Sequence, residues 1–94
     1  MLKIKWLGEC YNIQTPDEYA LVFIGNHGTG LNVFYMDDFD TALDAMLKDL
    51  VFGTGKRTFT DAGAAIIDSN SNVLREIYSP NAVRPIHGII VEKE

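Results

Sequence analysis

The sequence contains a single cysteine and no long apolar stretch. Because Cys10 has no second cysteine to pair with, an intrachain disulfide is excluded. An unpaired thiol is typical of a reducing compartment, so we expect a cytoplasmic location. The longest apolar runs, residues 20–25 and 33–36, are far shorter than the roughly 20 residues that a helix needs to cross a bilayer. The first residues alternate between charged and apolar types, unlike a secretory signal, so we expect neither membrane insertion nor export.

Basic residues are scarce as well. Eight Lys and Arg stand against thirteen Asp and Glu, which gives a net charge of -5 at pH 7. Nucleic-acid phosphates repel a chain of this charge, so direct binding to nucleic acid is not expected. The basic residues Lys3, Lys5, Lys56 and Arg57 are too few and too scattered for a nucleic-acid footprint.

What is present is an ordinary globular composition. Hydrophobic residues make up 47% of the chain and charged residues 22%, which is typical of a folded protein and excludes a disordered or low-complexity one. A chain of 94 residues has the length of one domain. We therefore expect residues 1–94 to form a single domain with one modest core.

Short strand patterns account for most of the chain. Leu2, Ile4 and Trp6 alternate with lysines, which is the period of a half-buried strand. Turn-forming residues separate this strand from two apolar runs that are broken by a glycine-rich loop, a pattern typical of a β-hairpin. A second hairpin and a final edge strand are expected in the C-terminal third. The expected strands are residues 2–7, 19–24, 31–36, 64–67, 73–78 and, as an optional edge strand, 86–91.

One helix is expected, over residues 39–52. Asp38 precedes it in the position of an N-cap, where a carboxylate accepts hydrogen bonds from first-turn amides. Gly53 follows as a helix stop signal. The apolar residues of this segment recur at helical spacing and predict one buried face. They are Phe39, Ala42, Leu43, Met46, Leu47 and Leu50.

These elements predict an α+β fold. Three strands, one helix and two or three further strands indicate a mostly antiparallel sheet of five or six strands with one helix packed on one face. The expected order is β-β-β-α-β-β, with the C-terminal edge strand as an option. The strand at 19–24 is apolar on both faces, so one helix leaves a face of the sheet uncovered. Either the C-terminal tail or a second copy of the chain covers it, and the second alternative predicts a homodimer.

Two loops resemble ligand-binding motifs but fail in detail. The glycine-rich segment 25–30 lacks the Lys and the Ser or Thr of a Walker loop, and it opens a strand where a dinucleotide site opens a helix. We interpret it as a hairpin loop. The segment 68–72 begins like a calcium loop but has Val73 in place of the required glycine and Ser79 in place of the bidentate glutamate. We interpret it as a turn.

Side chains suited to nucleophilic or metal chemistry are few. Cys10, His27 and His87 stand in three separate segments, without the spacing of a metal site. We therefore assign no catalytic, cofactor-binding or metal-binding residue, and we expect no cofactor and no enzymatic activity.

The acidic residues are concentrated in one segment. Residues 37–50 carry five Asp against one Lys, and so contribute -4 of the net charge. Acids in a first helical turn complement the helix dipole, which explains part of the pattern. It does not explain Asp49 near the helix end, or the like-charged i, i+4 pair of Asp40 and Asp44. The predicted partner-binding residues are Asp37, Asp40, Asp44 and Asp49, with a solvated helix face as the alternative interpretation.

The sequence therefore favours an interaction module. We expect a small acidic, non-enzymatic protein, an inhibitor or decoy that presents its acidic helix to the basic, nucleic-acid-binding surface of a partner protein. Anti-defence proteins of phages and mobile elements work in this way, and the analogy rests on size and charge. The alternative function is a small enzyme or ligand-binding domain that uses the segment 25–30 with His27 and Cys10.

Overall fold

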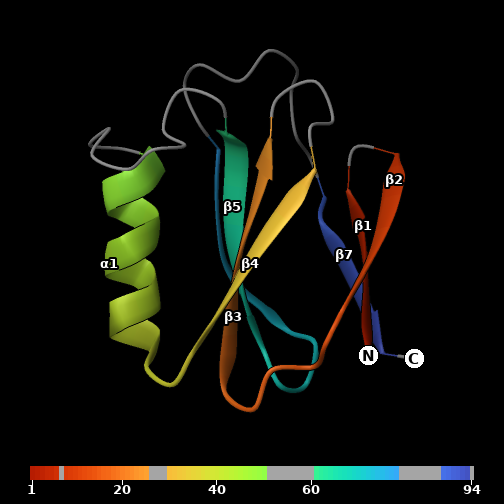
Figure 1. Ribbon diagram of the computed structural model, residues 1–94, viewed down its shortest axis with the longest axis horizontal. Coiled ribbons are helices and arrows are strands. Elements are labelled where there is room, and N and C mark those ends of the chain that lie inside the picture. Colours follow the sequence, from red (N-terminus) through yellow and green to blue (C-terminus); the bar gives the residue numbers. More distant parts are fainter. Residues whose placement is uncertain (7, 26–29, 51–60, 79–87, 94) are drawn as a thin grey trace.

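The computed structural model describes residues 1–6, 8–25, 30–50, 61–78 and 88–93. Their strands form two antiparallel sheets, one with the order β2-β1-β7 and one with the order β4-β3-β5-β6. Figure 1 shows three layers, with the helix α1 on one side of the larger sheet and the smaller sheet on the other. The elements are β1 (Leu2–Trp6), β2 (Glu9–Ile13), β3 (Tyr19–Gly25), β4 (Leu31–Met36), α1 (Phe39–Leu50), β5 (Asp61–Asp68), β6 (Val73–Tyr78) and β7 (Ile90–Lys93).

The predicted α+β class, antiparallel pairing and single helix agree with this architecture, whereas the predicted single sheet of five or six strands does not. The described residues form seven strands in two sheets. The strand that the prediction omitted is β2, which pairs with β1 from Leu2 opposite Ile13 to Trp6 opposite Glu9. Gly8 lies in the turn between them with a φ of 78°, a conformation that glycine adopts without strain.

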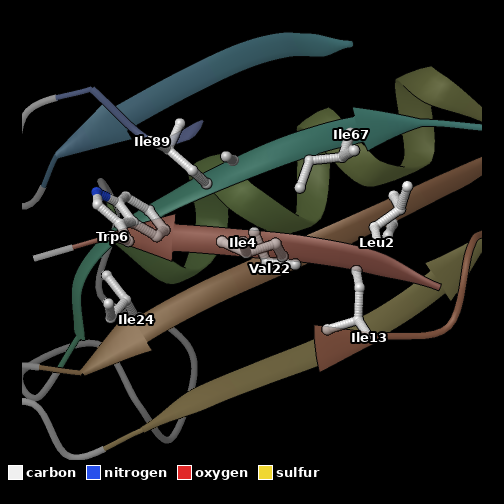
Figure 2. Close-up of a cluster of buried hydrophobic side chains, with 10 residues drawn as sticks. Leu2, Ile4, Trp6, Ile13, Val22, Ile24, Ile67 and Ile89 are labelled. Carbon is white, nitrogen blue, oxygen red and sulfur yellow. The ribbon is translucent and has the colours of Figure 1, made fainter. Parts of the chain in front are cut away.

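The smaller sheet covers the face of β3 that one helix leaves open. Ala20, Val22 and Ile24 of β3 pack against β1, β2 and the start of β7, and Figure 2 shows Leu2, Ile4 and Trp6 facing this layer. We call this cluster the inter-sheet core. Its buried residues are Leu2, Ile4, Trp6, Ile13, Ala20, Val22, Ile24, Ala65, Ile67 and Ile89.

This arrangement decides between the two alternatives, the C-terminal tail and a second copy of the chain, for the layer that covers the second face of β3. The C-terminal segment supplies β7, as one alternative expected, but the N-terminal hairpin of β1 and β2 supplies the other two strands. No second copy of the chain is needed to bury this face. The homodimer therefore stays a prediction, and it no longer follows from an uncovered sheet.

The helix covers the opposite face of the larger sheet, as predicted. Ala42 and Met46 are fully buried against Leu21 and Phe23 of β3 and against the small residue Ala64 of β5. Phe39 and Leu43 complete this contact as partly buried residues. The helix begins at residue 39, as predicted, and is described to residue 50. Residues 51 and 52 of the predicted helix, and its predicted stop at Gly53, lie outside the described part of the chain.

The described residues include no helix with both the length and the apolarity that a bilayer crossing requires. The one described helix has 12 residues and a charged outer face.

The packing predicts a large difference between inner and outer residues of the smaller sheet. Ile4 is fully buried in the inter-sheet core, whereas Ile90 is 52% exposed. Ile4→Ala should lower the free energy of unfolding by about 2–5 kcal/mol, and the control Ile90→Ala by less than about 0.5 kcal/mol. Trp6 is the only tryptophan and is 1% exposed. Its fluorescence during urea unfolding therefore measures the free energy of unfolding of both variants. Equal losses would contradict the packing of the smaller sheet on the larger one.

Candidate interaction surface

The helix start is organised by Asp38, the predicted N-cap. Its Oδ2 accepts hydrogen bonds from the backbone N–H and the Oγ1 of Thr41, both at 2.9 Å. The hydrogen bond from the Thr41 backbone, with that from its hydroxyl, holds the pKa of Asp38 below its ordinary value. Asp38 is therefore occupied in capping, and the neighbouring acids are the ones left to face a partner.

The predicted partner-binding residues project from the outer side of the helix and its entry. Asp37, Asp40 and Asp44 are exposed. Asp44 forms an ion pair at 2.9 Å with Lys48, one helical turn further along. This pair neutralises part of the negative charge of the helix face and stabilises the helix by about 0.3 kcal/mol. Asp49 belongs to α1, but its side chain lies outside what the structure describes.

The hairpin of β3 and β4 adds two acids that the sequence analysis did not assign to this surface. Tyr19 pairs with Met36, so the chain entering β3 and the chain leaving β4 meet at the same end of the sheet. This places Glu18 and Asp17 beside Asp37, and all three are exposed. The sequence signal that finds them is the predicted hairpin of residues 19–24 and 31–36, because Glu18 and Asp37 directly flank its open end.

We call Asp17, Glu18, Asp37 and Asp40 the acidic end. Within the described part of the chain, these four carboxylates form no ion pair and accept no hydrogen bond. Acids elsewhere are engaged: Glu92 pairs with Lys5 at 2.9 Å, and Glu76 accepts a hydrogen bond from Tyr78. Burial and this bond raise the pKa of Tyr78 to about 12. The acidic end is therefore where unpaired negative charge collects.

A shallow pocket lies within the acidic end. It is lined by residues 14–19 and 35–37 and holds about 200 Å³. The Tyr35 hydroxyl donates a hydrogen bond to the carbonyl oxygen of Gln14 at 3.0 Å, which ties β4 to the segment that leads into β3. Pockets for small molecules usually hold about 300–1,000 Å³. This one has the size of a single long side chain.

Of the residues of the enzyme alternative, only Cys10 and the two ends of the segment 25–30 lie in the described part of the chain. Cys10 is exposed on β2, opposite Lys5 in the register, and it does not line the pocket. His27 and His87 lie outside the described residues. No group of three or more His, Cys, Asp and Glu is close enough to hold a metal ion in the described ranges.

Both loops that resembled ligand motifs show the backbone features of turns. The N–H of Gly25 donates to the carbonyl of Gly30 at 3.0 Å, and Gly30 has a φ of 117°, as expected at the base of a hairpin loop. Residues 26–29 between them are outside the described ranges.

In the second loop, Asp68 accepts hydrogen bonds from the backbone N–H groups of Asn70 and Asn72, both at 2.9 Å. Burial opposes ionisation of Asp68, but the hydrogen bonds from Asn72 and Asn70 outweigh it and lower the pKa of this carboxyl. The carboxylate therefore closes the turn between β5 and β6.

No protein family, curated protein or solved structure matches this chain.

The N-cap predicts a defined acid dependence of stability. Because the folded-state pKa of Asp38 is lowered from 3.8, its contribution is present above about pH 4 and is lost as the pH falls through the folded-state pKa. Asp38→Asn keeps a capping oxygen that does not titrate. Between pH 7 and pH 3, the urea midpoint of Asp38→Asn should fall less than that of the original protein. Asp38→Ala should be less stable than the original protein at both pH values. Parallel curves for all three proteins would contradict the capping role.

Proposed function

We propose that this protein is a non-enzymatic interaction module that binds a basic surface of a partner protein through its acidic helix and the acidic end. The observation that carries the proposal is the convergence of exposed carboxylates that have no ion pair among the described residues and come from two segments: Asp17 and Glu18 before β3, and Asp37 and Asp40 at the start of α1. Clustered charges with no internal partner are available to an external one.

The charge distribution favours a partner that normally holds nucleic-acid phosphates. Five of the thirteen acids lie between residues 37 and 50, so the field of the molecule is strongest over one side. Clustered carboxylates present negative charge to a Lys- and Arg-rich surface, as phosphates do. An inhibitor or decoy of such a partner, working in the cytoplasm where Cys10 stays reduced, is the form of this function that we propose.

The shallow pocket supports binding over catalysis. Its volume of about 200 Å³ accommodates a side chain of a partner, and its lining among the described residues, 14–19 and 35–37, does not include Cys10. His27 lies outside the described residues. The enzyme alternative needs those two side chains in one cleft with the segment 25–30.

Removing charge from the helix should slow partner binding. In Asp40→Asn with Asp44→Asn, both changed residues are exposed, so stability should change little. Association with the partner, isolated by affinity capture and identified by mass spectrometry, should become several-fold slower and less dependent on salt. The control, Glu76→Gln with Glu92→Gln, removes the same charge from exposed sites on β6 and β7. Unchanged kinetics in the helix variant, or equal slowing in both, would contradict the proposal.

The same binding assay separates the two functions. Cys10→Ser with His27→Ala should leave the association rate and affinity unchanged, because neither residue belongs to the acidic end. Loss of binding or of activity, with the fold preserved in circular dichroism spectra, would favour the enzyme or ligand-binding alternative.

A further inference from the structure

The outer strand β4 has a sequence without the usual protection of an edge strand. Among the described strands, β4 pairs with β3 alone. Proteins normally protect such edges with charged side chains, proline or very short strands. The other outer strands of the described sheets carry such charges: β2 begins with Glu9, β7 has four residues with Glu92 and Lys93, and β6 carries Arg75 and Glu76. The six residues of β4, Leu-Asn-Val-Phe-Tyr-Met, include no charge and no proline.

The backbone of this edge is set up to bond another strand. The hydrogen bond from Gly25 to Gly30 marks the first bonded pair of the hairpin, and bonded pairs alternate along an antiparallel ladder. In the register of β3 and β4, residues 32, 34 and 36 therefore bond to β3. Leu31, Val33 and Tyr35 direct their N–H and C=O groups away from it, where no described strand lies beside them.

Two aromatic side chains flank this edge. Phe34 is 37% exposed and Tyr35 is 51% exposed, and as neighbours in a strand they point to opposite faces of the sheet. Both rings are held in place, Phe34 by an edge-to-face contact with Phe23 at 6.0 Å and Tyr35 by its hydrogen bond to Gln14. An added strand would gain apolar contact on both faces without a cost for ordering these rings.

The negative charge near β4 indicates which kind of strand would bind to its edge. The acidic end lies at the Met36 end of β4, and Tyr35, Asp17, Glu18 and Asp37 are among the residues that line the pocket there. A Lys or Arg side chain fits this setting through ion pairing and contact with the aromatic face. A second copy of the chain would bring a further net charge of -5 and so be repelled.

We propose that β4 binds an extended, basic segment of the partner protein by strand addition, with one Lys or Arg side chain entering the pocket beside Tyr35. This proposal rests on the proposed function, since it specifies how the basic partner is held. Main-chain hydrogen bonds to Leu31, Val33 and Tyr35 supply affinity, and the acidic end selects the charge of the segment.

The probe for this proposal is a ten-residue peptide of alternating Lys and Val. Two control peptides have the same length: one replaces Lys with Glu, and one carries N-methyl groups on all internal amides, which removes the N–H donors of both edges. The Lys-Val peptide should bind at least about tenfold more tightly than either control, a difference of about 1.4 kcal/mol. In NMR spectra, it should slow hydrogen exchange at the amides of Leu31, Val33 and Tyr35.

Variants of β4 locate the binding edge. Val33→Pro removes an outward N–H without removing a bond to β3, and should weaken binding of the Lys-Val peptide, whereas Val33→Ala should retain it. If Val33→Pro does not fold, as judged by Trp6 fluorescence, the pair Tyr35→Lys and Tyr35→Glu replaces it. Lysine at this position should weaken binding much more than glutamate, because only its charge repels the peptide.

Each contrary result has a definite meaning. If the N-methylated peptide binds as tightly as the Lys-Val peptide, strand addition is overturned. The proposed function is then tested by the helix variant, Asp40→Asn with Asp44→Asn, alone. Equal binding of the Glu peptide overturns the basic occupant. A dimer in light scattering that Val33→Pro converts to a monomer overturns the proposal in favour of a second copy at this edge. Failure of every peptide to bind overturns the further inference, whatever the helix variant shows.

Discussion

The rest of the structure depends on burying both faces of β3. Leu21 and Phe23 contact the helix, and Val22 and Ile24 contact the smaller sheet. A strand that is apolar on both sides needs a layer on each, because burial of apolar surface is the main force that stabilises a domain of this size. The short chain meets this need with one helix on one side and, on the other, a hairpin joined to a C-terminal strand.

Because the two faces of β3 are buried, the outer strands of the larger sheet are the parts that remain exposed for binding. Most apolar side chains are used in the two cores, and the exposed aromatic residues Phe34 and Tyr35 lie on an outer strand that neither layer covers completely. The helix starts immediately after β4, with Asp38 as its cap. The open strand edge and the acidic helix start are therefore adjacent because a two-residue connection joins them.

The acidic residues divide into two groups by their contacts. Some are engaged within the fold, such as Asp38 in capping, Asp68 in a turn and Glu92 with Lys5. The carboxylates of the acidic end have no such contact within the described residues, although neighbouring like charges destabilise the folded state slightly. Such repulsion between like charges is typical of an interaction surface, because the positive charges of a basic partner compensate it on binding.

Local patterns in the sequence determined the helix, its cap at Asp38, two hairpins and the inward face of Leu2, Ile4 and Trp6, because each follows from propensity and period over a few residues. They also located the acidic helix residues. The sequence did not reveal the strand Glu9–Ile13, in which only Ile13 is buried, and so did not predict a second sheet. Tertiary structure alone decided which segments cover the second face of β3, because pairings between distant segments depend on the packing of the whole core, which no local period encodes.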